Sequence, residues 1–456
     1  MPNVFLINLG CAKNLVDSEH ILGLIKQEDG FDITGDLIGA DIAIVNTCAF
    51  IKPAVEESID TILELTSLKE QGHLKRLLVV GCFVQRYGKK LLREIPEVDG
   101  WLGTGQINRI REVLHPEHDN SPILLITRPD FLADHSAPRV QATPFYSAYL
   151  KIAEGCSHHC SYCIIPALRG QFRSRTVDSL FIEAREMVER GVKEINLVAQ
   201  DTTWYGHDLN PSCTLEGLLE KLLTISGLKW LRILYAHPYH VTERLLDLID
   251  TEEGLCPYLD IPIQHVNPDI LRAMGRPSGT EPIPQLIERI RHRSRHIALR
   301  TTVMVGFPGE TEEQFKELRE FVRETEFDRL GVFSFSPEEG APAAKLKDRV
   351  SERIVRNRVK EIMELQAGIS KKLNRRVVGK TIPVLVEGLS PETDLLLTGR
   401  TATMAPDVDG QVLINKGSAA VGQIVPAHIT EAHTYDLVGG IERGGGYRFG
   451  SALQSR

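Results

Sequence analysis

The sequence predicts an α/β protein in three parts: a parallel α/β domain, a partial (βα)6 barrel and a small antiparallel β-barrel at the C-terminal end. Three observations predict it. Apolar runs alternate with helical patterns over residues 1–118, six more strand-like runs with helical segments between them follow up to residue 373, and short β-rich runs fill residues 374–440. A length of 456 residues accommodates about three domains of ordinary size.

The first part, residues 1–118, alternates strand with helix. Its apolar runs are residues 4–9, 41–46 and 77–80, and the helical patterns after them are residues 16–25, 53–65 and 87–93. This alternation predicts a mostly parallel sheet whose strands end at one common edge. Residues 115–143 are rich in Pro, Asp, His and Ser, and we expect a linker there.

The second part, residues 143–373, contains the barrel. Its strand-like runs are residues 149–153, 195–199, 231–235, 259–263, 301–305 and 331–335, and a charged helix over residues 351–373 ends it. Six βα units predict a barrel that is open relative to the eight-unit version. Ligands in such folds bind at the carboxyl ends of the strands.

The third part, residues 374–440, has the pattern of a small all-β barrel. Its apolar runs are residues 381–387, 395–399, 411–414 and 423–429, and Gly, Pro and Asp turns separate them. The tail, residues 441–456, contains Gly444, Gly445 and Gly446, and we expect the chain beyond Gly439 to be flexible.

Composition excludes several protein classes. Eight cysteines are too few for a disulfide scaffold in so long a chain, and three of them within eight residues indicate metal binding under reducing conditions. The N-terminus has no signal peptide pattern and no run reaches about 18 apolar residues, so we expect a cytoplasmic protein without membrane contact. A net charge of -8 argues against a protein that coats nucleic acid, although a local basic patch stays open.

Cys156, Cys160 and Cys163, the barrel triad, form a CxxxCxxC motif directly after the first barrel strand. Three thiolates can hold three irons of a 4Fe–4S cluster, and the fourth iron can accept a chelating ligand such as S-adenosylmethionine. The alternative is a zinc knuckle in which His158 or His159 completes the ligand set. Structural zinc normally takes four ligands in two paired units, and the sequence has no second CxxC, so the cluster is the better interpretation.

Cys11, Cys48 and Cys82, the N-terminal triad, each follow or end a predicted strand of the first domain. Parallel strands end at the same edge of a sheet, so these side chains can converge on one ligand. Each could instead be a buried structural cysteine, but all three at strand ends favour a second 4Fe–4S cluster with one open iron. Cys213 and Cys256 belong to no such group of cysteines in the sequence, and we interpret them as structural or incidental.

Polar residues near the ends of the barrel strands are candidate cofactor contacts. Gln200 and Asp201 follow the second strand, Gln264 and His265 follow the fourth, and Arg300 precedes the fifth. Each could equally be a structural polar group. The further candidates for cofactor or substrate contacts are the turn over residues 306–311, Asp260, Arg169, Arg173 and Arg175.

Two clusters with open irons give one catalyst two tasks. One cluster can cleave S-adenosylmethionine to a 5′-deoxyadenosyl radical, and the other can hold a sulfur species that faces the same substrate. This combination predicts the insertion of sulfur at an unactivated carbon.

Over nearly its whole length the chain resembles the radical S-adenosylmethionine methylthiotransferases, which combine a three-cysteine N-terminal domain, a barrel with CxxxCxxC and a TRAM-like β-domain. Within that family it is similar to the RimO-type branch, which modifies an aspartate of small-subunit ribosomal protein twelve. The stretches that carry this similarity are residues 9–19 (LGCAKNLVDSE), 46–51 (NTCAFI), 163–170 (CIIPALRG) and 435–437 (YDL). The resemblance says nothing about the glycine-rich tail.

The resemblance implies that the barrel triad binds a radical cluster and the N-terminal triad an auxiliary cluster. S-Adenosylmethionine would serve both as methyl donor to sulfur and as radical source. The radical would take hydrogen from the aspartate β-carbon, and a methylthio group would be attached there. We expect three partners: the ribosomal protein, an electron donor such as flavodoxin or ferredoxin, and a sulfur donor.

The charge of the β-domain bears on protein versus RNA as substrate. Residues 375–440 hold five basic and seven acidic residues, a net charge of -2. Barrels that bind RNA need cationic residues along the backbone path, whereas an acidic surface attracts a basic ribosomal protein. Two alternatives stay open: a methylthiotransferase that acts on adenosine in transfer RNA, and a non-enzymatic metal-binding protein associated with ribosomes.

Overall fold

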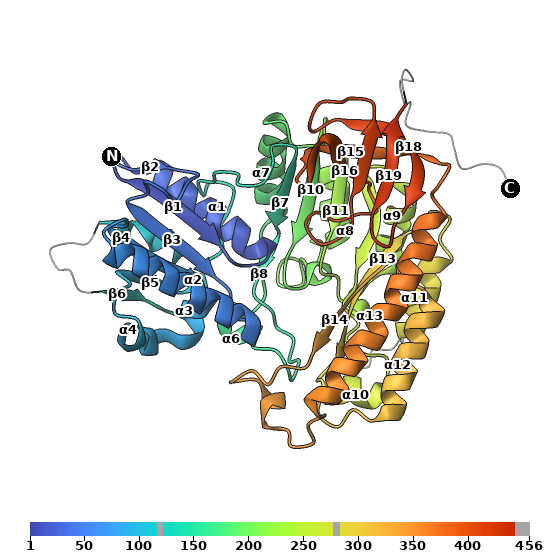
Figure 1. The fold of residues 1–456 in the computed structure, drawn as a ribbon, viewed down its shortest axis with the longest axis horizontal. Coiled ribbons are helices and arrows are strands. Elements are labelled where there is room, and N and C mark those ends of the chain that lie inside the picture. Colours follow the sequence, from blue (N-terminus) through green and yellow to red (C-terminus); the bar gives the residue numbers. More distant parts are fainter. Residues whose placement is uncertain (116–121, 277–282, 443–456) are drawn as a thin grey trace.

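The computed structural model describes residues 1–115, 122–276 and 283–442. A first α/β domain, a six-stranded partial barrel and a closed C-terminal β-barrel follow one another along the chain (Figure 1). Of the tail that we expect to be flexible, residues 443–456 lie outside the described residues. No helix in the described part of the chain is long and apolar enough to cross a membrane.

The first domain is a parallel sheet in the order β2-β1-β3-β4-β5-β6. Its strands are β1 (Asn3–Asn8), β2 (Asp32–Ile33), β3 (Ile42–Thr47), β4 (Arg76–Gly81), β5 (Gly100–Leu102) and β6 (Ile123–Leu125). Its helices are α1 (Ala12–Lys26), α2 (Lys52–Glu70), α3 (Cys82–Tyr87), α4 (Leu91–Glu94) and α5 (Ile110–Leu114). Apolar residues of α1 and α5 pack on one face of the sheet, and those of α2, α3 and α4 pack on the other.

The three predicted strands and the helices after them form, with two differences. Cys82, expected at the end of a strand, is the first residue of α3. The reason is Gly81, which has φ +101° and turns the chain directly from strand to helix. The segment expected to be a linker also contributes a strand, because β6 pairs with β5 and extends the sheet past residue 118.

The partial barrel is a parallel sheet in the order β14-β13-β12-β11-β10-β7, which confirms the predicted six-stranded barrel. Its strands are β7 (Ser147–Lys151), β10 (Glu194–Val198), β11 (Trp230–Ile233), β12 (Leu255–Asp260), β13 (Ala298–Val305) and β14 (Arg329–Ser334). Its helices are α6 (Ile165–Arg169), α7 (Val177–Glu189), α8 (Leu215–Leu223), α9 (Glu243–Thr251), α10 (Pro268–Ala273), α11 (Ile283–Arg291), α12 (Glu312–Thr325) and α13 (Glu352–Arg375). A two-stranded sheet of β8 (Ala153–Glu154) and β9 (Arg173–Ser174) lies beside it.

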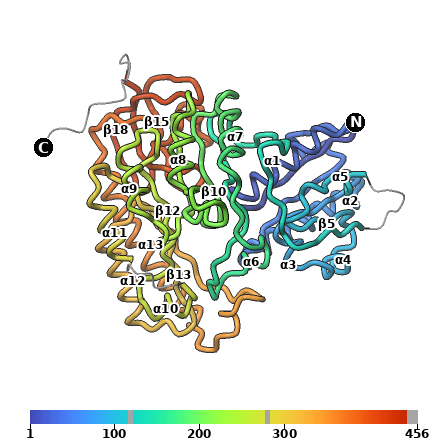
Figure 2. Tube along the Cα trace, turned by 180° about the vertical axis from the view of Figure 1, so that it is seen from behind, coloured from blue at the N-terminus to red at the C-terminus, as the bar shows by residue number. Residues whose placement is uncertain are grey.

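An outer layer of helices covers one face of this sheet, as the view from behind shows (Figure 2). Outward strand residues such as Leu197, Ile233 and Leu259 pack against that layer in one continuous apolar cluster. The strand β12 occupies Leu255–Asp260 rather than the expected 259–263. Pro262 lacks an N–H group for the ladder, which accounts for the early end of the strand.

The C-terminal barrel closes in the order β15-β16-β17-β19-β18, and only its β17–β19 pair is parallel within the described residues. Its strands are β15 (Thr381–Ser390), β16 (Thr393–Arg400), β17 (Val412–Lys416), β18 (Ile424–Ala432) and β19 (Leu437–Ile441). The expectation of a flexible chain from Gly439 is wrong for β19. Gly439 is needed there because an added Cβ would lie 2.5 Å from the His428 carbonyl oxygen.

The C-terminal barrel covers the inner face of the partial barrel. The Tyr149 hydroxyl donates to Asp407 at 3.0 Å, and the Tyr258 hydroxyl donates to Asp409 at 2.8 Å. Both aspartates lie in the turn between β16 and β17. The inner face is therefore closed by the C-terminal barrel, and ligands are left with the carboxyl ends of the strands.

A buried ion pair anchors this contact. Glu194 is fully buried and lies 2.9 Å from Arg232 and 2.6 Å from Arg400 of the C-terminal barrel. Burial by itself raises the pKa of Glu194. The positive charges of Arg400 and Arg232 lower it by more, so the pKa is about 2. The carboxylate therefore stays ionised inside the interface, where it depends on both arginines.

We expect Arg400→Met to lower the free energy of unfolding by about 3–5 kcal/mol, because it leaves a buried carboxylate short of a partner. Denaturant unfolding followed by circular dichroism measures the loss. Arg185→Met is the control, since Arg185 is exposed and lies 3.6 Å from an exposed Glu189. An equal loss in both variants would contradict the role assigned to Arg400.

The same pair predicts a pH dependence. The pKa of Glu194 is about 2 in the folded chain and near 4.5 when unfolded, so its contribution is present above pH 4.5 and is lost as the pH falls towards 2. We expect the stability difference between wild type and Arg400→Met to shrink over that pH range. A difference that is constant with pH would contradict the prediction.

Candidate functional site

The barrel triad lies in the loop after β8. Gly155 begins the loop with φ +79°, and an added Cβ there would lie 2.2 Å from the Gln171 carbonyl oxygen. Only glycine tolerates that approach. The Cys156 N–H donates to the Gly170 carbonyl at 3.0 Å, so the loop is held against the end of α6.

The loop brings the three thiols of the barrel triad together. Burial is the main cause that raises the pKa of Cys156 to about 11 and that of Cys163 to about 12, and the charge of Cys160 contributes to both increases. Thiols that influence each other in this way are close neighbours, and they bind metal as thiolates. Three such sulfurs fit a 4Fe–4S cluster with one iron left open.

The thiols of the N-terminal triad also converge. Cys11 precedes α1, Cys48 follows β3, and Cys82 begins α3, so all three lie at the carboxyl edge of the first sheet. Backbone N–H groups in the first turn of α1 point to the Cys11 sulfur, and those of the two residues after Cys48 point to its sulfur. Such N–H groups stabilise thiolates.

Cationic neighbours distinguish the N-terminal triad from the barrel triad. Burial raises the pKa of Cys82 to about 11 and also raises that of Cys48. Cys11 is exposed to solvent. Burial acts on Cys11 too, but the charges of Lys13 and Arg169 outweigh it and lower its pKa.

Arg169 connects the two triads. Its guanidinium is 3% exposed and hydrogen-bonds the Cys82 sulfur. It also lies 2.6 Å from Asp17 of α1 and 3.3 Å from Glu154, and it donates to the side chain of Asn14. Glu154 directly precedes the loop of the barrel triad, so one buried cation contacts both cysteine sites.

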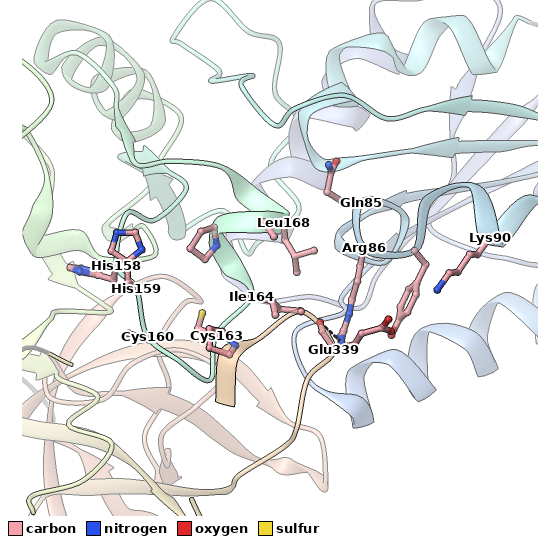
Figure 3. A pocket seen from close by; sticks show the side chains of 15 residues that line it. Gln85, Arg86, Lys90, His158, His159, Cys160, Cys163, Ile164, Leu168 and Glu339 are labelled. Atoms are coloured by element: carbon pink, nitrogen blue, oxygen red, sulfur yellow. Dashed lines mark hydrogen bonds between the residues drawn. The ribbon is translucent and has the colours of Figure 1, made fainter. Parts of the chain in front are cut away.

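A cavity of about 480 Å³ lies between α3 and the loop of the barrel triad (Figure 3). Cys160 and Cys163 line it from the barrel, and Arg86 and Lys90 line it from the first domain. Arg86 is fixed there by an ion pair with Glu338 at 2.8 Å. A group bound to the barrel triad and an anionic substrate side chain can meet in this cavity.

Gln200 and Asp201, two predicted cofactor contacts, lie at the end of β10 with different surroundings. Gln200 Nε2 donates to Glu154 at 3.4 Å, while its Oε1 is buried without a hydrogen-bond partner among the described residues. A donor group of a bound cofactor would satisfy that oxygen. Asp201 already hydrogen-bonds His158 at 2.6 Å and His240 at 2.8 Å.

Gln264 and Tyr235 have left-handed backbones at the ends of two neighbouring strands. Their φ values are +67° and +61°, which is uncommon for residues other than glycine. Such conformations concentrate at functional sites. Gln264, a predicted cofactor contact, therefore lies in a constrained turn at the barrel mouth.

Arg300 and Asp260, also predicted contacts, pair with each other on the inner face. Arg300 lies 3.2 Å from Asp260 and 3.6 Å from Asp409 of the C-terminal barrel. Arg175 pairs with Glu183 at 2.5 Å, and Arg173 donates to a backbone carbonyl at 2.7 Å. These contacts give each arginine a partner inside the protein.

His265 and the turn over residues 306–311 form a separate buried group. His265 lies 3.3 Å from Glu310, and Glu310 pairs with Arg358 of α13 at 2.6 Å. The Gly306 N–H donates to the same carboxylate. The group ties α13 to the turn after β13.

Sequence reasoning missed Lys13 and Arg276. The Lys13 ammonium lies 3.3 Å above the Tyr235 ring, beside Cys11. Arg276 donates to the Tyr162 hydroxyl at 3.2 Å, and Tyr162 lies between two cysteines of the barrel triad in the sequence. A lysine two residues after Cys11 was the available signal for the first, and nothing local in the sequence marked the second.

Three families match successive parts of the chain. They are the uncharacterized protein family UPF0004 over residues 3–103, the radical SAM superfamily over residues 150–322 and the TRAM domain over residues 378–441. Among solved structures, the radical S-adenosylmethionine methyltransferase TsrM from Kitasatospora setae has a similar fold, with a TM-score of 0.55 and 16% identity. That alignment covers 75% of this chain and 77% of TsrM.

Curated relatives match almost end to end. The ribosomal protein uS12 methylthiotransferase RimO of Geotalea uraniireducens is 52% identical over 96% of this chain and 98% of its own length. The protein of the same name from Geobacter sulfurreducens is 51% identical over the same shares. At this identity and coverage, the chain belongs to the RimO family of radical S-adenosylmethionine methylthiotransferases.

Proposed function

We propose that this chain attaches a methylthio group to the β-carbon of an aspartate in ribosomal protein uS12. Family membership supports the reaction and the substrate. The observation that carries the assignment of sites is the pair of three-thiol groups at facing sheet edges, joined through Arg169. In this proposal the barrel triad holds the radical cluster and the N-terminal triad holds the auxiliary cluster.

When bound, the two 4Fe–4S clusters and S-adenosylmethionine supply the radical, the methyl group and a place for sulfur. The chain supplies position and charge. Gly155 lets the loop of the barrel triad pass against the backbone of residue 171, which fixes the three sulfurs relative to α6. The unpaired Gln200 oxygen is placed to accept a hydrogen bond from the cofactor's ammonium group.

The cavity between the domains suits an aspartate side chain. Lys90, Arg86 and Glu339 line it, and Arg86 is already paired with Glu338. A carboxylate that enters beside Cys160 and Cys163 can pair with the Lys90 ammonium. The net charge of -2 on the C-terminal barrel favours a basic protein over transfer RNA as the partner.

Two further partners follow from the chemistry. Radical formation consumes an electron, so a donor such as flavodoxin or ferredoxin must reach the barrel triad. Each turnover also consumes sulfur, so a sulfur donor must resupply the N-terminal triad. Since its substrate is a ribosomal protein, we place the enzyme in the cytoplasm.

Replacing one triad at a time tests the assignment. We expect about eight irons in the reconstituted wild type and about four in either triple Cys→Ala variant. The N-terminal variant should still release 5′-deoxyadenosine, whereas the barrel variant should release none. Only the wild type should add about 46 Da to an aspartate of uS12.

Cys213→Ala is the control, because Cys213 belongs to neither triad, and it should match the wild type. Iron, sulfide, 5′-deoxyadenosine and peptide mass are measured on the same anaerobic samples. Modification of transfer RNA instead of uS12 would contradict the substrate, and an unchanged iron count in either triple variant would contradict the sites.

Arg169 should act on the N-terminal triad through charge. We expect Arg169→Met to lower the reduction potential of the auxiliary cluster, because a buried cation beside the Cys82 sulfur is lost. Methylthiolation should fall roughly 10–100-fold, the loss typical of outer-shell partners. Arg169→Lys keeps the charge and should recover part of the potential.

The potential is measured by a redox titration followed by electron paramagnetic resonance. The barrel triad is replaced by alanine in that background so that only the auxiliary cluster contributes. Arg190→Met, on the exposed end of α7, is the control. If Arg169→Met loses activity while the reduction potential of the auxiliary cluster stays unchanged, Arg169 has only a structural role.

A further inference from the structure

One group of side chains at the barrel mouth has no place in the proposed reaction. His158, Asp201, His237 and His240 offer ligand atoms that all lie within 4.8 Å of one another. They come from three segments: the loop of the barrel triad, the end of β10 and the turn after β11. No cysteine belongs to the group, but His158 lies two residues from both Cys156 and Cys160, so the group adjoins the barrel triad.

Asp201 is the centre of the group, and its carboxylate is held in a fixed orientation. Its Oδ2 atom lies 2.6 Å from His158 Nε2 and 2.8 Å from His240 Nδ1. Its Oδ1 atom accepts from the Thr203 hydroxyl at 2.7 Å and from the Trp204 N–H at 3.2 Å. Hydrogen bonds of this kind to the second oxygen orient carboxylates that bind metals.

His237 supplies the observation that points to a missing ligand. Its side chain is buried, with the residue 6% exposed, and neither ring nitrogen has a hydrogen-bond partner among the described residues. A buried imidazole normally pairs at least one nitrogen. The ring lies 4.5 Å from that of His158 and 4.7 Å from that of His240, between centroids, so its free nitrogens belong to this group.

We propose that His158, Asp201, His237 and His240 bind one divalent transition metal ion. Three imidazoles and one carboxylate are a borderline set of nitrogen and oxygen ligands that suits Zn²⁺, with Fe²⁺ as a competitor where it is abundant. Tetrahedral zinc with bonds of about 2.0–2.1 Å needs ligand atoms roughly 3.3 Å apart. The three imidazole rings are stacked with interplanar angles of 19–28°, so they must turn about their side-chain bonds to direct their nitrogens at one ion. The imidazole protons on the coordinating atoms move to the other ring nitrogens, so no oxidant or reductant is needed.

The surroundings allow entry and limit exchange. The side chains of His158 and His240 are 21% and 15% exposed, so an ion can reach them from solvent. The Trp204 ring lies 4.2 Å from that of His240, tilted by 43°, and flanks the group on that side. An ion there would fasten the loop of the barrel triad to the ends of β10 and β11, and it would reserve Asp201 for the metal.

The test uses the enzyme reconstituted anaerobically with both clusters and freed of excess iron. Zn²⁺ is added, unbound metal is removed, and zinc, iron and sulfide are counted per chain. Zinc-edge X-ray absorption then identifies the ligand atoms. We expect one zinc per chain with a shell of nitrogen and oxygen only, and an unchanged iron count.

His237→Phe and His240→Ala should lower zinc affinity at least roughly 10–100-fold, since even outer-shell partners cost that much. His240 is partly exposed, so its variant guards against a folding defect in His237→Phe. His159→Ala is the matched control, because His159 is an exposed neighbour in the same loop and lies outside the group; it should bind zinc as the wild type does.

Sulfur in the zinc shell, no retained zinc, or equal binding by the wild type and both variants would each overturn the site. Because iron and sulfide are counted on the same samples, these outcomes leave the proposed methylthiotransferase function intact. A loss of both clusters together with normal zinc binding would instead contradict that function and support the site.

Discussion

A buried charge must be paired, and this constraint fixes how the first domain meets the partial barrel. Arg169 and Lys151 are the cations, and Asp17 and Glu154 are the carboxylates. Burial by itself raises the pKa of Glu154. The charges of Lys151 and Arg169 lower it by more, so the pKa is about 2. Because Asp17 lies in α1 and the other three lie in the barrel domain, any other docking would leave uncompensated charge. Charge pairing therefore acts together with the apolar contacts of Ile164 and Leu168 to set how the two cysteine triads lie relative to one another.

Parallel sheets explain why each triad lies at the carboxyl edge of its sheet. The strands of the first sheet end beside α6, and the loop of the barrel triad begins at the carboxyl end of the barrel sheet (Figure 1). The C-terminal barrel occupies the inner face through Tyr149, Tyr258 and Arg232. The cavity beside Cys160 and Cys163 then remains as the approach for a substrate side chain. The first domain and the partial barrel both line that cavity, while the C-terminal barrel covers the inner face of the partial barrel.

Local patterns were enough to predict the six barrel strands and both cysteine triads. The CxxxCxxC motif can be recognised within eight residues of sequence. The N-terminal triad can be recognised because each of its cysteines follows an apolar run. The strand β19 was missed, since Gly439 and Gly440 have the composition of a tail. An added Cβ on Gly439 would meet the backbone of β18, and one on Gly440 would meet Lys416 of β17. Composition cannot carry information about such a neighbour.

The polar residues show where local reasoning ends. Gln200 and Asp201 are adjacent at a strand end, and sequence patterns predict a cofactor contact equally for both. Their partners come from residues 39–46 positions away and differ between the two. Asp201 hydrogen-bonds two histidines, whereas Gln200 keeps one buried oxygen without a partner among the described residues. A buried oxygen without a partner can accept a hydrogen bond from a ligand. Among the described residues, Gln200 therefore keeps a free acceptor, whereas both carboxylate oxygens of Asp201 already accept within the protein.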